Sequence, residues 1–466
     1  MAERILEKHE GLYRLVISVF TLCAVFASKG EAERTAPFAL CFLIFICIGL
    51  LLFHTTRYLT LPFLSFTLSV IFCYDSFSVF IRYIWLAPVF AVCLLFHLIR
   101  LKPQWKAGAT LPPLIAVAAG TLLGGVGMIA PAQYFRPVSL AFLAGLGPGT
   151  VFCYWILKNE TRGKGDKEAL LSDLRWWGMT AALIALRFYV QNVPDLSEPF
   201  FYPNSPQWSN NIGTMMMLAL PAMMAGARKQ WRYYVLSFVM VLALISSGSR
   251  GAQLLAGPPE FCLCLFWLYR TEKRPVERLF KRLIAFYGVL FGALLLAAMF
   301  LGRNSLAFDG TQEVRFKLAL RSLENFRQNP LFGSGLGYLG NADLYSGKAG
   351  TINWYHVFPA QVIGSMGLFG VLAWGWQLIR RARVSFRLWW EEAFALPLCY
   401  AGLLLMSMVN PGEFCPVPYA FLAVFLYVLA ENELEKRGQG DFHLPCFKKR
   451  KGADLQKGDA ISFEGG

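Results

Sequence analysis

The chain has 466 residues, of which 56% are hydrophobic and 16% charged, and its formal charge is +15. Soluble domains contain about 25% charged residues, so this composition excludes an ordinary soluble protein. Apolar runs of about 17 to 25 residues, the length that crosses a bilayer as a helix, recur from end to end. The basic residues lie mainly in the short segments between these runs, where they set membrane orientation, and we therefore expect no nucleic-acid partner. The sequence predicts an all-α, polytopic membrane protein.

The apolar runs predict about fourteen transmembrane helices. The first run, "LVISVFTLCAVFA", lacks a small-residue cleavage site, which predicts an uncleaved helix. Pro258 and Pro259 in "GPPE" interrupt a later run and predict a kink or break in that helix. In chain order, the predicted centres lie near residues 20, 45, 66, 89, 121, 146, 183, 218, 240, 260, 292, 367, 400 and 423.

The distribution of charge places the N-terminus in the cytoplasm. With the segments alternating from there, 32 of the 44 lysines and arginines, Arg381 among them, fall on the cytoplasmic side. An even number of spans returns the basic tail "CFKKRKGADLQK" to that side. We therefore expect a single polytopic membrane domain over residues 1–430 and a disordered, membrane-hugging cytoplasmic tail over residues 431–466.

The only long loop, residues 303–355, is predicted to be external. Within it, "VRFKLALRSLENFRQ" (314–328) has apolar residues at helical spacing. A proline and several glycines follow and end the pattern. The loop therefore predicts an amphipathic helix on the membrane surface, with Phe316, Leu320 and Leu323 inward, and then a tight glycine-rich turn.

The arginines that break the charge pattern gather on the external side. Arg250 stands in "SSGSRGAQ" between two apolar runs, where an arginine is costly without a partner. The alternative is that Arg250 anchors a helix end at the lipid headgroups. A cluster of external arginines suits an anionic ligand, because guanidinium matches phosphate oxygens in a planar fork. The predicted external set is Arg82, Arg136, Arg187, Arg250, Arg315, Arg321 and Arg327, with His356 at the mouth of a span.

Two other external features have alternative interpretations. His356 opens the span "HVFPAQVIGSMGLFGVLAW", where a neutral histidine can accept a proton from a hydroxyl; an interfacial histidine with a solvated ring is the alternative. The turn from Gly333 to Gly340 offers backbone N–H donors to an anion, but it lacks the Lys-Ser/Thr of a phosphate-binding loop, which favours a plain turn. The external carboxylates are scattered, so we expect no metal ion and no other cofactor.

Four motifs in one order resemble the O-antigen ligase and polymerase superfamily. They are "SSGSRGA", "VRFKLAL", "NPLFGSGLG" and "GSMGLFG", and together they cover residues 246–375. The segment "YPNSPQWSNNIGTMMMLALP" also resembles the family's helix start after an external loop. The resemblance implies a GT-C type glycosyltransferase in the bacterial plasma membrane. Such a protein transfers a glycan from undecaprenyl diphosphate to an acceptor hydroxyl at the outer face, and the acceptor is a lipid- or cell-wall-linked molecule or a growing glycan.

The resemblance also implies roles for particular residues. The family's arginines that bind diphosphate match Arg250 and Arg315, and its histidine that activates the acceptor matches His356; without a covalent intermediate, the reaction inverts the anomeric carbon. We assign Arg321 to the diphosphate as well. Further contacts to donor or acceptor are expected from Arg136, Arg187, Asn204 and Gly335. The sequence departs from the family at Ala319, Val357 and Ser365, where tryptophan, asparagine and glutamate are common. These changes leave the acceptor open.

Three other interpretations remain at this stage. Ligase and polymerase differ in acceptor, and the sequence does not choose between them. A flippase for lipid-linked oligosaccharides also fits fourteen spans, although it should show two related halves and charged residues inside the bundle. The sequence contains no internal repeat. A catalytically silent membrane scaffold would not need Arg250, Arg315 and His356 together.

Overall fold

The computed structural model describes residues 2–28, 31–71, 79, 81–128, 134–161, 165–192, 209–247, 249, 251–252, 257–271, 282, 288, 310–341, 343–344 and 352–438. This part of the chain is all-helical, as predicted. Every predicted span centre lies in a helix or its kink, except the centre near 292, which is outside the described residues. The helices are α1 (Ala2–Lys8), α2 (Glu10–Ser28), α3 (Ala32–Leu52), α4 (Thr60–Ile71), α6 (Leu86–Leu101), α7 (Leu111–Leu123), α9 (Pro137–Ala144), α10 (Thr150–Glu160), α11 (Asp166–Asn192), α12 (Ser209–Gly226), α13 (Arg232–Ile245), α14 (Gly257–Thr271), α16 (Gly310–Gln328), α17 (Phe358–Leu388), α18 (Ala395–Ser407) and α19 (Val417–Glu435).

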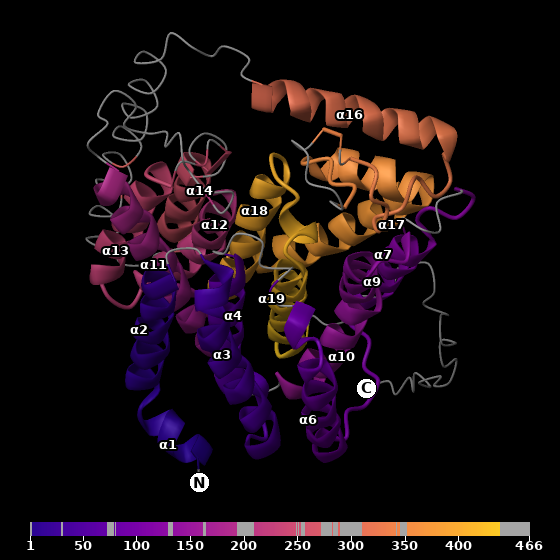
Figure 1. Ribbon diagram of the computed structural model, residues 1–466. Helices are drawn as coiled ribbons and strands as arrows, with labels where there is room; N and C mark the ends of the chain where they lie inside the picture. The colour runs from indigo at the N-terminus through magenta and orange to yellow at the C-terminus, as the bar shows by residue number, and fades with distance from the viewer. Residues whose placement is uncertain are drawn as a thin grey trace, which may run out of the picture.

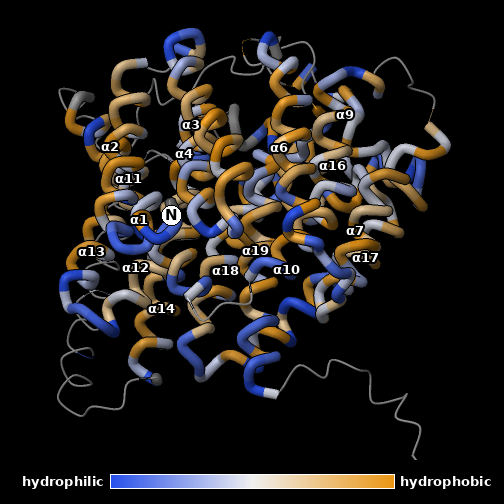
Figure 2. The backbone as a smooth tube through the Cα atoms, turned by 90° about the horizontal axis from the view of Figure 1, so that it is seen from below, coloured by the Kyte–Doolittle hydropathy of each residue, from blue (hydrophilic) through white to orange (hydrophobic). Residues whose placement is uncertain are grey.

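Five helical stretches in the described part are long and apolar enough to cross a membrane. They are Glu10–Ser28, Ala32–Leu52, Pro137–Glu160, Phe358–Leu388 and Val417–Glu435. Shorter apolar helices accompany them, and apolar residues extend along most of the bundle (Figure 2). A helix needs about 20 apolar residues to span the hydrocarbon core. The five long stretches and the shorter apolar helices together indicate a multi-pass membrane protein.

The helices form an upright bundle with one helix lying across its end. In Figure 1, α2, α3 and α4 stand side by side, and α16 lies crosswise above α17. The N-terminus and α1 are at the opposite end of the bundle from α16. The N-terminus and the helix of the long loop therefore lie at opposite ends of the bundle, while their sides of the membrane stay a prediction.

Helix α12 is the centre of the core. Its residues from Ile212 to Met224 are buried all round, and a helix that is apolar on every face belongs inside other helices. It packs against α11, α13, α14 and α18. The consecutive methionines Met215, Met216 and Met217 are fully buried, since their unbranched side chains fill irregular gaps between helices.

Proline and glycine set the boundaries of several helices. Pro258 and Pro259 lie in the first turn of α14, so the predicted break is the start of that helix. A π-type turn at Gly145–Gly149 joins α9 to α10, with Gly147 in a non-helical conformation. Gly367 interrupts α17 with φ 60° and ψ −154°, a conformation that a residue with a Cβ rarely adopts.

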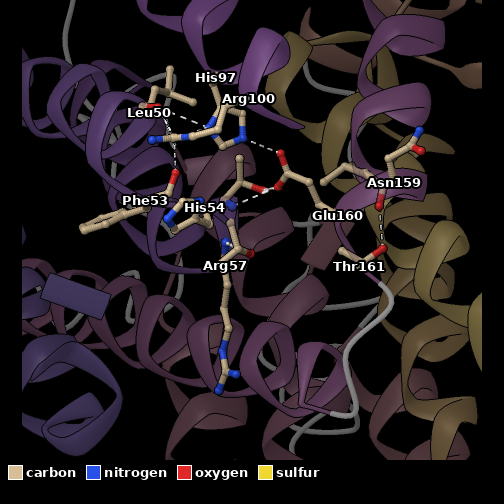
Figure 3. Close-up of polar contacts among 12 residues, drawn as sticks. Leu50, Phe53, His54, Arg57, His97, Arg100, Asn159, Glu160 and Thr161 are labelled. Atoms are coloured by element: carbon tan, nitrogen blue, oxygen red, sulfur yellow. Dashed lines mark hydrogen bonds and ion pairs between the residues drawn. The ribbon is translucent and has the colours of Figure 1, made fainter. Parts of the chain in front are cut away.

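A polar cluster joins the helix ends on the side away from α16 (Figure 3). The Nε2 atom of His97 lies 2.7 Å from Oε1 of Glu160, and the other carboxylate oxygen of Glu160 accepts from the backbone N–H of Thr56 at 2.9 Å. Arg100 donates to the carbonyls of Leu50 and Leu51 at 2.8 and 2.7 Å. These carbonyls end α3 without helical partners, so this cluster ties α3, α6 and α10 together.

Two basic side chains of the predicted cytoplasmic segments are buried in the fold. Lys158 is buried and donates to Asn432 Oδ1 at 2.8 Å and to Glu435 Oε1 at 2.6 Å. Helix α19 therefore continues past the predicted boundary at residue 430. Arg381 is buried inside the bundle, 2.8 Å from Glu413 Oε1. A count of basic residues along the sequence predicts the side of the membrane on which a segment lies. It cannot show that a carboxylate from another helix pairs with a basic side chain and makes its burial tolerable.

Candidate functional site

Helix α16 packs with a face that differs from the predicted one. Leu318 and Ser322 are buried, whereas the side chains of Phe316, Leu320 and Leu323 are 60%, 45% and 47% exposed. The helix itself is confirmed, but the prediction of its inward residues is wrong. The small side chain of Ser322 lets α16 approach Gly364 on α17 closely. The stripe with Phe316, Leu320 and Leu323 is left facing outward.

The glycine-rich turn after α16 pairs its backbone with the interruption of α17. The N–H groups of Ser334 and Gly335 donate to the carbonyls of Gly364 and Ser365, each at 2.8 Å. The N–H of Leu368, just after the interruption, donates to the carbonyl of Pro330 at 2.8 Å. The motifs "NPLFGSGLG" and "GSMGLFG" therefore occur together because their backbones form one contact.

The same pairing settles the expected role of the turn. The N–H groups of Gly333, Ser334 and Gly335 bond within the fold, so the plain turn is confirmed for these residues. Gly335 has φ 86°, and a Cβ there would lie 1.0 Å from the hydroxyl oxygen of Tyr134. Gly335 therefore allows a close backbone approach, and its contact to donor or acceptor stays a prediction.

A buried polar network lies between α16, the turn and α17. The hydroxyl of Tyr355 accepts from Asn325 Nδ2 at 2.5 Å and from Asn353 Nδ2 at 2.6 Å. Asn353 also donates to Ser334 Oγ at 2.7 Å. Gln361 at the start of α17 accepts from the N–H of Tyr355 at 2.9 Å and donates to the carbonyl of Asn353 at 3.1 Å. The network fixes the segment that leads into His356.

His356 follows this network in a left-handed backbone conformation, with φ 56°. A residue with a Cβ seldom adopts that region outside turns and functional sites. Burial lowers the pKa of His356, and the charge of Arg315 also lowers it, whereas a hydrogen bond to the Asn410 side chain raises it; the net result is a pKa of about 4, against 6.5 for an ordinary histidine. The imidazole is therefore neutral at pH 7 and can accept a proton. Arg315 and His356 are two of the three predicted site residues, and in the structure the charge of Arg315 acts on the His356 imidazole.

The sequence reasoning missed Asn410, which reaches His356 from the loop between α18 and α19. A buried ion pair holds this loop: Glu413 accepts from Arg381 Nη1 at 2.8 Å and from the hydroxyl of Tyr400 at 2.9 Å. The ring of Phe414 stacks on Phe358, with centroids 5.6 Å apart. The available sequence signal was the motif "NPGEF" (410–414), which places a polar and an acidic residue between two closely spaced apolar runs. The structure shows that the acidic residue, Glu413, is buried.

Arg250 and Asn204 lie outside the described residues. The two neighbours of position 250 are described. Ser249 Oγ donates to Asn210 Oδ1 at 2.7 Å, and a Cβ on Gly251 would lie 2.4 Å from Val409 Cγ2. Val409 precedes Asn410, so Gly251 lies beside the loop that contacts His356, whereas Ser249 contacts α12.

The other predicted arginines have contacts elsewhere. Arg321 makes a two-pronged ion pair with Asp343, at 2.6 and 2.8 Å, which competes with the predicted contact to diphosphate. That bond lowers the pKa of Asp343. Arg187 stacks over the ring of Phe26 on α2, 3.9 Å from its centroid. Arg136 is exposed at the start of α9. The structure does not bring Arg187 to His356.

The described residues contain no group of three or more His, Cys, Asp or Glu side chains placed to hold a metal ion. They do contain an apolar cavity of about 350 Å³ between α3, α4, α6, α10 and α19. Leu50, Phe152 and Phe425 are among its lining residues, and no charged side chain lines it. This cavity is therefore not a site for a phosphate group.

The fold and the site define a class of protein: a multi-pass helical membrane protein in which an arginine on the crosswise helix acts electrostatically on a half-buried histidine. Residues 235–375 match the family model described as O-antigen ligase, which confirms the resemblance, so this part of the chain carries the domain of that family. The matched region runs from α13 into α17 and contains Arg250, Arg315 and His356. No curated protein and no solved structure matches the chain.

Proposed function

We propose that this protein is an inverting, metal-independent glycosyltransferase of the GT-C type at the outer face of the bacterial plasma membrane. It transfers a glycan from an undecaprenyl-diphosphate-linked donor to an acceptor hydroxyl. The observation that supports this most is the combination of a half-buried, neutral His356 with Arg315 inside the region that matches the O-antigen ligase family. A base beside a cation suits a reaction in which a hydroxyl attacks and a phosphate leaves.

In the proposed reaction the acceptor oxygen forms a bond to the anomeric carbon, and the bond from that carbon to the diphosphate oxygen breaks. The diphosphate leaves with the bonding electrons, and the acceptor proton passes to His356. Arg315 and Arg250 hold the diphosphate and stabilise the charge that grows on it. Asn410 orients the imidazole through its hydrogen bond. Direct displacement without a covalent intermediate inverts the anomeric centre.

The proposal includes fourteen spans with both termini in the cytoplasm and the site facing outward. The 32-to-12 division of basic residues supports this, although Arg381 and Lys158 are buried in the bundle and not in loops. Single cysteines introduced at Ser346 and Lys448 should react with an impermeant reagent from opposite sides of the membrane. Labelling of both from one side contradicts the topology.

A flippase remains the second candidate, because the bundle contains the buried charges that such a transporter needs. Arg381 and Glu413 form an ion pair inside the bundle. Their hydrogen bonds hold the loop that carries Asn410, however, which gives them a role in positioning the site. The family match and the single long loop favour the transferase. The acceptor is a lipid- or cell-wall-linked molecule if the protein is a ligase and a growing glycan if it is a polymerase, and both alternatives remain.

The decisive experiment measures glycan transfer by purified protein from an undecaprenyl-diphosphate-linked oligosaccharide. His356→Ala and Arg315→Ala should each reduce transfer at least about a hundredfold, the usual loss when a group that stabilises transition-state charge is removed. Lys317→Ala is the matched control, since Lys317 lies on α16 and pairs with exposed Glu313 at 2.7 Å. Folded His356→Ala protein with the wild-type rate would exclude the mechanism. Movement of labelled lipid without transfer would instead support the flippase.

A further inference from the structure

The hydroxyl of Tyr355 joins three segments directly and a fourth, α17, through Ser334. Tyr355 is fully buried, and its hydroxyl oxygen lies 2.5 Å from Asn325 Nδ2 on α16 and 2.6 Å from Asn353 Nδ2 in the segment before α17. Ser334 Oγ of the glycine-rich turn lies 3.2 Å away. Ser334 in turn reaches the carbonyl of Gly364 on α17 at 3.1 Å.

The directions of these hydrogen bonds follow from the groups involved. An amide nitrogen only donates, so the Tyr355 oxygen accepts from both Asn325 and Asn353. Burial raises the pKa of Tyr355, so its hydroxyl keeps its proton. That proton is directed to Ser334 Oγ, and the Ser334 hydroxyl is directed to the carbonyl of Gly364. A chain of donors therefore runs from α16 to α17 through one phenol oxygen.

The packing around the ring leaves little freedom. A Cβ on Gly364 would lie 2.7 Å from a carbon of the Tyr355 ring and 2.8 Å from Ser322 Cβ. The absence of a side chain at Gly364 thus lets the ring sit between α16 and α17. His356 follows directly, and Arg315 lies on the same helix as Asn325, nearly three turns away.

We propose that Tyr355 is a positioning residue: its hydroxyl fixes α16 against the segment before α17 and so sets the separation between the Arg315 guanidinium and the His356 imidazole. The inference rests on the proposed function for its effect on activity, and on the fold alone for its effect on His356. Tyr355→Phe keeps the ring but removes the acceptor of the half-buried Asn325 amide and one of the two acceptors of the buried Asn353 amide. Proteins avoid leaving such donors unpaired. The expected result is a small rotation or shift of α16.

The first measurement is independent of activity. The chain has five histidines, so NMR of histidine-labelled protein in detergent can follow the titration of His356, assigned with His356→Gln. In Tyr355→Phe we expect the pKa of His356 to rise from about 4 toward 6.5, because water enters around the imidazole and, to a smaller extent, because Arg315 is no longer held beside it. The control is Tyr154→Phe, which removes a buried hydroxyl that donates to Glu431 at 2.7 Å at the other end of the bundle. It should leave the titration unchanged.

The second measurement is the rate of transfer. A displacement of about 1 Å in catalytic geometry costs about a hundredfold, so Tyr355→Phe should lower kcat by about that factor. In an Arg315→Ala background the further loss should be much smaller, because the hydroxyl acts through Arg315 and His356. Additive losses would indicate a general structural defect and overturn the inference.

A second variant keeps the proposal testable if Tyr355→Phe does not fold. Asn325→Ala removes only one donor to the hydroxyl and should produce smaller changes in kcat and in the His356 titration, both in the same directions. Folded variants in which kcat and the pKa of His356 equal those of the wild type would overturn the positioning role. If the wild type transfers no glycan but Tyr355→Phe still raises the pKa of His356, only the proposed function fails.

Discussion

The low pKa of His356 predicts how the stability of the protein depends on pH. In the folded state the pKa is about 4, against 6.5 for an ordinary histidine. Above pH 6.5 the imidazole is neutral in both the folded and the unfolded chain, so it does not make the free energy of unfolding depend on pH. Below that value the unfolded chain binds a proton that the folded chain refuses, so the free energy of unfolding falls as pH decreases from 6.5 to 4. One pKa unit corresponds to about 1.4 kcal/mol, which gives a total loss of about 3 kcal/mol.

Other groups also titrate in this range, so the assay compares two proteins. Thermal unfolding in detergent is measured between pH 7 and pH 4 for the wild type and for His356→Gln, whose side chain does not titrate. The wild type should lose about 3 kcal/mol more than the variant over this interval. Arg315→Gln should reduce that difference, because removing the nearby positive charge raises the pKa of His356. Parallel pH profiles for the wild type and His356→Gln would refute the assignment of an imidazole that stays neutral in the folded protein.

Three further predictions concern the rest of the site. Arg315→Lys keeps the charge but loses the planar fork, so transfer by purified protein should fall at least about tenfold; an unchanged rate would contradict a two-pronged contact. Arg381→Met leaves the carboxylate of Glu413 buried without its cation, and calorimetry or denaturant unfolding should show a loss of about 3 to 5 kcal/mol, whereas a loss below about 1 kcal/mol would argue for an exposed pair. Gly335→Ala places a methyl group against the hydroxyl of Tyr134, where φ is 86°; a lowered unfolding temperature is expected, and an unchanged one would contradict the close packing of the turn.

The sequence by itself determined the helical bundle and the order of its motifs. Apolar runs of bilayer length form α-helices, because a helix satisfies all backbone hydrogen bonds within one segment inside the lipid. The interruption at Gly367 was not predicted, whereas Pro258 and Pro259 marked a position where a helix starts or breaks. The spacing in 314–328 likewise predicted a helix, since a period of 3.6 residues is a local property of the chain. These features need no knowledge of which segments meet.

Only the tertiary structure decided which side chains share an environment. The apolar stripe of α16 pointed to Phe316 as an inward residue, but close approach to α17 required Leu318 and Ser322 there. Asn410 reaches His356, and Glu413 neutralises Arg381, across long separations in sequence. No local pattern encodes such pairs, because their cost and benefit depend on burial beside a partner from another helix. The sequence therefore determined where the helices lie along the chain, and their packing decided which charges and hydrogen-bonding groups surround His356.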